Sequence, residues 1–100
     1  MASMIVISTT AVPDHVRGAL SRWLIEPAPG LYVGTVSARV RDQLWAAVAG
    51  CVADGAATCV HPADNEQGFT IRTAGQRRRQ ISDFDGLQLV RFLPEPPPEP

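Results

Sequence analysis

Arg77, Arg78 and Arg79 form the densest group of chemically active side chains in the sequence. All nine basic residues of the chain are arginines. A guanidinium group carries a planar fork of donors that fits the oxygens of a phosphate. Contacts of this kind hold a nucleic-acid backbone without reading its bases, so the run predicts a sequence-independent phosphate contact. The alternative is a charged loop that contacts only water, and codon usage would explain an all-arginine set equally well.

The remaining candidates for chemistry are few and scattered. Asp14 stands at the start of a predicted helix, where its carboxylate suits the helix dipole, and it is only a weak candidate for a metal ligand. Asp83 and Asp85 precede Gly86, and turn geometry explains this pattern better than metal binding does. His61 falls in a predicted loop and is expected on the surface. The sequence pairs no nucleophile with a base, so no catalytic residue is predicted.

The composition is that of a small globular protein. The chain has 100 residues, 45% of them hydrophobic, and a formal net charge of −1. This length forms one domain with a small core, which a second copy would help to stabilise. Cys51 and Cys59 are the only cysteines and form no CxxC motif, so reduced, buried thiols in a cytoplasmic protein are expected rather than a zinc site. No apolar run approaches the roughly 20 residues that a membrane span needs.

Hydrophobic periodicity predicts the element order β-α-β-α-β-β-β. Alternating or continuously apolar segments predict strands at residues 4–9, 31–36, 56–60, 69–73 and 87–93. A stripe with helical spacing predicts a first helix that starts at residues 12–14 and ends before a turn at residues 27–30. A second helix is predicted from the cap Ser37 to Cys51. Residues 74–80 are predicted to form a basic loop.

Two helices on one face of a mainly antiparallel sheet give an α+β sandwich of the ferredoxin-like type. The predicted domain covers residues 4–93, and residues 94–100 form a Pro/Glu-rich tail that favours polyproline II. Trp23 lies on the apolar stripe of the first helix and is predicted to be in the core. Trp45 lies off the stripe of the second helix and is predicted at the core edge, with a place in an interface as the alternative.

Two strings are the most specific features of the chain: YVGTVSA at residues 32–38 and DFDGLQLVRFLP at residues 83–94. Other features agree with them in order and spacing, namely Val12-Pro13, Arg17-Gly18, Arg41, Trp45 and residues 70–79. Together they resemble the type I-E form of CRISPR-associated protein 2. The resemblance covers residues 4–94, which is nearly the whole chain.

This resemblance implies a ferredoxin-like homodimer that acts as a scaffold in CRISPR spacer acquisition. The dimer would bridge copies of the larger integrase subunit and bind the duplex prespacer DNA through its phosphates. Arg78 and Arg79 match paired arginines that grip the DNA backbone in the family, Arg17 matches another basic position, and His15 stands where relatives carry an arginine. With Arg77, these are the predicted DNA contacts. The last strand is implied to pack on the neighbouring protomer, through an interface of Leu89, Val90, Phe92, Leu93 and Pro94.

The family is also described as a metal-dependent endonuclease, and here the sequence departs from the family pattern. In relatives an acidic residue ends the first strand, and two such residues in the dimer are thought to share a Mg²⁺ ion. Thr10 occupies that position, and a neutral hydroxyl lacks the charge that would bind Mg²⁺. The scaffold role requires no cofactor, whereas the endonuclease alternative requires Mg²⁺. The third possibility is a ferredoxin-like regulatory or ligand-binding module, against which the arginine run argues.

Overall fold

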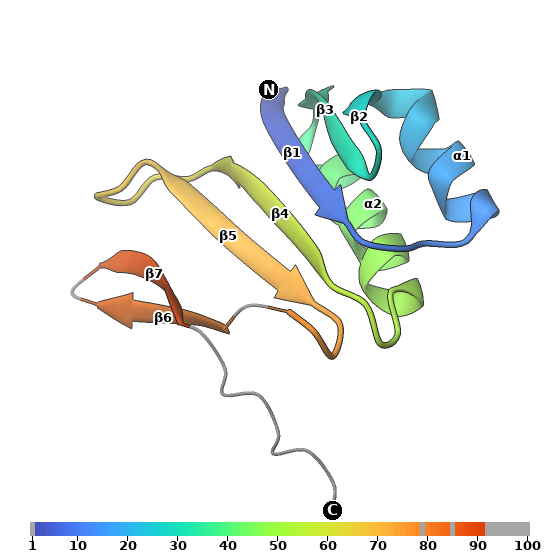
Figure 1. Ribbon diagram of the computed structural model, residues 1–100. Coiled ribbons are helices and arrows are strands. Elements are labelled where there is room, and N and C mark those ends of the chain that lie inside the picture. Colours follow the sequence, from blue (N-terminus) through green and yellow to red (C-terminus); the bar gives the residue numbers. More distant parts are fainter. Residues whose placement is uncertain (1, 79, 85, 92–100) are drawn as a thin grey trace, which may run out of the picture.

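Seven strands and two helices make up the part of the chain that the structure, a computed structural model, describes: residues 2–78, 80–84 and 86–91 (Figure 1). The strands are β1 (Ser3–Thr9), β2 (Ile25–Ala28), β3 (Leu31–Val36), β4 (Ala57–Pro62), β5 (Phe69–Ala74), β6 (Gln80–Phe84) and β7 (Leu87–Arg91). The helices are α1 (Asp14–Trp23) and α2 (Ala38–Cys51). Within these residues, neither helix is long and apolar enough to cross a membrane.

The main sheet has the strand order β2-β3-β1-β4-β5, and every neighbouring pair is antiparallel. Its first four strands and the two helices follow the order β1-α1-β2-β3-α2-β4 along the chain, which is the ferredoxin-like arrangement. Both helices lie against the same face of the sheet (Figure 1). The predicted α+β ferredoxin-like sandwich is confirmed, and β5 extends the sheet by one strand.

Strand β2 lies where the sequence predicts a turn. The turn is confined to Pro29 and Gly30, and the preceding four residues form a strand, so this part of the prediction is wrong. Proline lacks a backbone donor and is tolerated in a sheet only at an edge or a bulge. β2 meets both conditions, because it is the edge strand and its pairing with β3 shifts register between Ile25 and Ala28.

The C-terminal region also differs from the prediction. Residues 80–84, expected in a loop and turn, form β6, which pairs with β7 in a separate hairpin beside β5 (Figure 1). The turn itself is confirmed at Gly86, which has a φ of 85°. β4 continues to Pro62, so His61 lies on a strand and is only 7% exposed. His61 is therefore not a surface loop residue, because the alternation of β4 turns it to the same face as Ala57 and Cys59.

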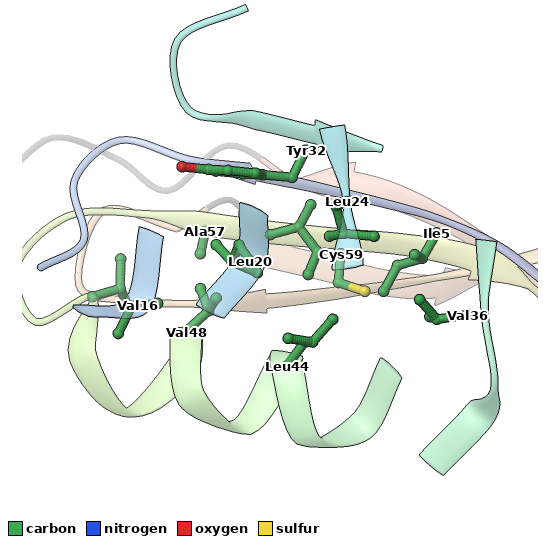
Figure 2. Packing of buried hydrophobic residues seen from close by; sticks show 12 residues of the cluster. Ile5, Val16, Leu20, Leu24, Tyr32, Val36, Leu44, Val48, Ala57 and Cys59 are labelled. Carbon is green, nitrogen blue, oxygen red and sulfur yellow. The ribbon is translucent and has the colours of Figure 1, made fainter. Parts of the chain in front are cut away.

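The core lies between the two helices and one face of the sheet (Figure 2). The helical stripes contribute Val16 and Leu20 from α1 and Leu44 and Val48 from α2, as the spacing predicts. Strand residues add Ile5, Ile7, Tyr32, Val36, Ala57 and Cys59, and Leu24 and Val52, which directly follow the two helices, complete the cluster. Trp45 is half-buried and packs against this cluster, so its predicted place at the core edge is confirmed. Full burial of each large apolar side chain contributes about 1.5–3 kcal/mol.

Trp23 is 55% exposed, so the prediction that it lies in the core is wrong. α1 ends at Trp23, and the next residue, Leu24, has an extended backbone and is the one that fills the core. The end of the helix lies close to β3 at Gly34. A Cβ added at Gly34 would be 2.7 Å from Cδ2 of Leu24 and 3.1 Å from the carbonyl oxygen of Trp23. The space beneath the helix end is therefore filled by Leu24 and cannot take an indole ring.

Replacing Gly34 by alanine is expected to destabilise the fold by about 1–3 kcal/mol, because the added methyl group overpacks the contact between α1 and β3. Urea unfolding measures this as a lower midpoint with an unchanged slope. The matched control is Gly18→Ala in the middle of α1, where no atom lies within 4 Å of the added Cβ. This control should gain up to about 1 kcal/mol from helix propensity. Equal effects of the two substitutions would contradict the close packing at Gly34.

Candidate nucleic-acid interface

Four connecting segments meet at one end of the main sheet. Thr9, the last residue of β1, pairs with Ala57, the first of β4, and Ala57 pairs with Ala74, the last of β5. The turn between β2 and β3 lies at the same end, because Ser8 pairs with Leu31. The segments that join β1 to α1, α2 to β4 and β5 to β6 therefore lie beside that turn. We call this the loop end of the sheet.

Two arginines of the 77–79 run stand on a turn that is tied to the segment before β4. The Arg77 N–H donates to the Gly55 carbonyl at 3.0 Å, and Nη1 of Arg78 donates to the Gly75 carbonyl at 3.0 Å. Gly75 has a φ of 94°, and a Cβ added there would collide with the carbonyl oxygen of Gly55. Both arginines are exposed. A fixed backbone thus presents two cationic residues to the solvent at the loop end.

Helix α1 begins at the loop end and carries two more of the predicted DNA contacts. His15 and Arg17 are both exposed in its first turns, and the side chain of Arg17 is 55% exposed. The structure therefore brings His15, Arg17, Arg77 and Arg78 to one end of the sheet from distant parts of the sequence. Arg79, the remaining predicted contact, lies outside the described residues.

A pocket of about 240 Å³ opens beside Arg17 at the loop end. It is lined by Thr9, Thr10, Ala11, Val12, Arg17, Glu26, Pro29, Gly30 and Tyr32. Nη2 of Arg17 lies 3.8 Å from Oε1 of Glu26. The pKa of Arg17 is above its usual value, mainly because of the nearby Tyr32 hydroxyl and next because of the charge of Glu26. The hydroxyl nonetheless makes no hydrogen bond of acceptable geometry with the described residues.

Neither Glu26 nor Tyr32 is a candidate from the sequence alone. Glu26 falls between the first helix and the prolines of a predicted turn, where a lone carboxylate has no evident partner. Only the pairing of β2 with β3 shows that this segment returns beside the start of α1. Tyr32 belongs to a strand on sequence grounds, but its neighbours Leu31 and Val33 are also apolar, so no alternation in the sequence shows which face Tyr32 takes.

Thr10, at the end of β1, has a structural role. Its N–H donates to the Ala56 carbonyl at 2.9 Å, and its hydroxyl accepts a hydrogen bond from the Ala56 N–H at 2.9 Å. Glu26 is the only carboxylate in the lining of the neighbouring pocket, and it faces the cationic Arg17. Mg²⁺ prefers anionic oxygen ligands, and an adjacent guanidinium repels it. The residues at the end of β1 therefore do not fit a Mg²⁺ ion.

The other acidic residues singled out in the sequence have local structural partners. Asp14 is the first residue of α1, where its charge is stabilised by the helix dipole. Oδ1 of Asp83 accepts a hydrogen bond from the Gly86 N–H at 3.0 Å, which confirms its predicted turn role. Asp85 lies outside the described residues. Among the residues that are described, no group of three or more His, Cys, Asp or Glu side chains could hold a metal ion.

Two further arginines belong to the fold rather than to the loop end. Nε of Arg41 and Nη1 of Arg72 lie 3.1 Å and 3.2 Å from Oδ1 of Asp42. The hydrogen bond from Arg41 is the main reason that the pKa of Asp42 is below its ordinary value, so the carboxylate stays charged at neutral pH. Nη1 of Arg41 also lies 3.3 Å from Nδ1 of His61. This cluster joins α2 to β5 across the edge of the core.

The two cysteines are free thiols, as the sequence predicts. Cys59 is fully buried, and this burial raises its pKa to about 11. Its thiol is therefore protonated and unreactive near neutral pH. Cys51 is only partly buried, so the prediction of burial is confirmed in full for Cys59 alone.

The predicted partner interface is only partly within the described residues. Leu89 and Val90 lie on β7 and are 51% and 49% exposed, and Leu87 on the same strand is 43% exposed. Phe92, Leu93 and Pro94, the rest of that predicted interface, lie outside the described residues. The last strand thus presents apolar side chains to the solvent in a single chain.

The fold and the loop end define a small ferredoxin-like protein with exposed arginines gathered at one end of its sheet. Residues 4–89 match the family described as CRISPR-associated protein (Cas_Cas2CT1978). Because this match covers most of the 100 residues, the chain belongs to that family of CRISPR-associated proteins. Its role is therefore related to CRISPR.

Replacing Thr10 by valine is expected to lower stability by about 0.5–1.5 kcal/mol, because the Ala56 N–H loses the hydroxyl that accepts its hydrogen bond. Thr10→Ser keeps that hydroxyl and should lose markedly less. Urea unfolding of the three proteins measures the difference. A larger loss for serine than for valine would show that the methyl group, and not the hydrogen bond, is what matters at this position.

Proposed function

We propose that two copies of this chain form a dimeric scaffold that holds duplex prespacer DNA during spacer acquisition in a type I-E CRISPR system. In this proposal the dimer bridges copies of the larger integrase subunit in the cytoplasm. The observation that carries it is the gathering of His15, Arg17, Arg77 and Arg78 at the loop end, on a backbone held by hydrogen bonds between neighbouring segments. Membership of a CRISPR-associated family supports it further.

The chemistry of the loop end suits a ligand of any base sequence. Exposed guanidinium groups bond phosphate oxygens through charge-assisted hydrogen bonds and read no base edges. Acquired DNA varies in sequence, so a scaffold has to bind the backbone alone. Binding by arginine requires no metal ion, and the proposed role therefore needs no cofactor. The near-neutral net charge is compatible with this role, because the basic groups are clustered.

The face of the sheet opposite the helices supports the proposed dimer. Ile25, Val33, Val6, Val60 and Ile71 pair in register and form an apolar row across all five strands of the main sheet. Met4 and Phe69 flank this row and are 55% and 39% exposed. Apolar patches of this extent on a small domain commonly mark protein interfaces. A second copy placed on this face would bury the row and double the number of phosphate contacts.

The hairpin of β6 and β7 supports the second part of the proposed assembly. Among the described residues, β7 pairs with no strand other than β6, and on its other edge the Gln88 N–H donates to Oε1 of Gln67 at 2.6 Å, a side-chain contact that the strand of another chain would replace. Leu87, Leu89 and Val90 supply the apolar contacts that such strand addition needs. We propose that this segment, continuing through Phe92, Leu93 and Pro94, packs on the neighbouring protomer and contacts the integrase.

Duplex-DNA binding by the complex with its host's integrase subunit tests the proposed function. Arg17, Arg78 and Arg79 in both protomers would make up to six phosphate contacts, which contribute up to about −5 to the slope of log affinity against log salt. Arg78→Ala with Arg79→Ala should weaken binding and reduce the magnitude of that slope by about 4. Fluorescence anisotropy over a range of salt concentrations measures both quantities.

The matched control removes two arginines from the opposite end of the sheet. Arg22 in the last turn of α1 and Arg39 in the first turn of α2 are both exposed and lie away from the loop end. Arg22→Ala with Arg39→Ala changes the net charge equally but should leave the salt slope nearly unchanged. If both double variants behave like the wild type, or both lose affinity alike, the loop end is not the DNA contact.

Val33→Asp is expected to convert the proposed dimer into a monomer, because it places a charge within the apolar row. Size-exclusion chromatography with light scattering measures the mass, and circular dichroism checks that the fold persists. Ala47→Asp is the control, since Ala47 is exposed on α2. A wild-type protein that is monomeric at micromolar concentration, or a Val33→Asp variant that stays dimeric, would exclude this dimer interface.

A further inference from the structure

Arg17 differs from the other exposed arginines at the loop end because it faces a carboxylate. Its Nη2 lies 3.8 Å from Oε1 of Glu26 across the pocket at the end of β1. The Arg17 side chain is 55% exposed, whereas that of Glu26 is only 25% exposed. Glu26 is therefore the more enclosed partner, and Arg17 is the partner that can turn outward to solvent or to a ligand.

The carboxylate of Glu26 is held in place by the turn between β2 and β3. Its Oε2 accepts a hydrogen bond from the Gly30 N–H at 3.0 Å. Gly30 is itself fixed, because its carbonyl accepts from the Thr9 N–H at 2.7 Å and its φ of 79° is one that few other residues adopt. The Gly30 N–H is also the main reason that the pKa of Glu26 is below its ordinary value, so the group is charged at neutral pH.

The Tyr32 hydroxyl adds a polar group to the lining of the same pocket. Tyr32 is fully buried, and Figure 2 shows its ring lying along the strands with the hydroxyl pointing away from Ile5 and Val36. This hydroxyl has no hydrogen-bond partner among the described residues, although Arg17 and Glu26 line the pocket with it. Arg17 turned toward the pocket thus meets a carboxylate and an unused hydroxyl, both of which can accept its hydrogen bonds.

We propose that Glu26 competes with DNA phosphate for Arg17 and so sets how much this arginine contributes to binding. This inference rests on the proposed function. A phosphate that takes Arg17 must displace the internal ion pair and then lies close to an anionic carboxylate, and both effects oppose binding. Arg77 and Arg78 have no ion pair with a carboxylate among the described residues. A duplex that already contacts Arg77 and Arg78 can also bind Arg17, whereas a single small phosphate gains little affinity from Arg17. Glu26 thus makes the Arg17 contact selective for a polyanion.

Glu26→Gln tests the competition directly. Glutamine keeps the size of the side chain and an oxygen that accepts from the Gly30 N–H, but it removes the charge. The variant should bind duplex DNA about threefold to tenfold more tightly at physiological salt, as expected for releasing an exposed ion pair in each protomer. Its salt slope should steepen by up to about 2, toward the value of about −5 for all six contacts, because Arg17 is released in each protomer. Glu66→Gln, in the exposed loop at the opposite end of the sheet, makes the same charge change and should have little effect.

The Arg17→Ala background separates competition from a general charge effect. There Glu26→Gln should no longer tighten binding, because no arginine remains to be released. If it tightens binding equally with and without Arg17, or changes nothing in the wild-type background, the competition is excluded. The proposed function would stand in either case, provided that Arg78→Ala with Arg79→Ala still weakens binding.

A measurement without DNA keeps the two proposals separable. In the free protein, the Nη–H protons of Arg17 should exchange faster with solvent in Glu26→Gln than in the wild type, measured by NMR of the guanidinium resonances. An unchanged exchange rate would overturn the inference whether or not the protein binds DNA. A faster rate together with no DNA binding by any variant would instead support the Glu26 contact and overturn the proposed function.

Discussion

The reciprocal hydrogen bonds between Thr10 and Ala56 are the constraint on which the loop end depends. They continue the pairing of β1 with β4 beyond the last strand residues and join the segment that enters α1 to the segment that leaves α2. The next residue along, Gly55, accepts the Arg77 N–H, and the absence of a Cβ at Gly75 lets Gly75 approach the Gly55 carbonyl closely. One set of contacts therefore positions Arg77 and Arg78 on one side of the loop end and α1 with Arg17 on the other. The hydroxyl of Thr10 is part of this set.

The arginines of the chain fall into groups that composition alone does not distinguish. Arg41 and Arg72 share Asp42 and join α2 to the sheet. Arg17 faces Glu26, whose negative charge offsets that of the guanidinium group. Arg77 and Arg78 stand on a turn and have no carboxylate paired to them in the described part of the chain. A net charge of −1 is thus compatible with a local group of exposed arginines. What matters for a phosphate ligand is which guanidinium groups lack an internal partner, and this is a property of the fold.

The sequence predicts the layers of the fold better than its edges. The stripes of Val16 with Leu20 and of Leu44 with Val48 indicate both helices, because burying one face of a helix requires apolar residues three or four positions apart. The sequence does not predict β2, because Pro27 is acceptable in a strand only at the edge of a sheet or at a bulge, and both depend on how β2 pairs with β3. Trp23 has the spacing of a core residue. Because the end of α1 lies so close to Gly34, Leu24 and not Trp23 fills the space beneath it. Propensity describes a residue's own backbone, whereas these outcomes depend on neighbouring elements.

The candidate site shows the same division. The arginine run, Arg17 and His15 are recognisable by type, spacing and resemblance, whereas Glu26 and Tyr32 are not, because their partners are brought to them by the pairing of β2 with β3. The central claim is that the loop end binds the DNA backbone. Amide NMR of the labelled protein titrated with a short duplex tests it most directly. The account predicts shifts at residues 75–78 and in the first turns of α1, with none at residues 37–39. Shifts confined to the opposite end of the sheet, or none at all, would contradict it.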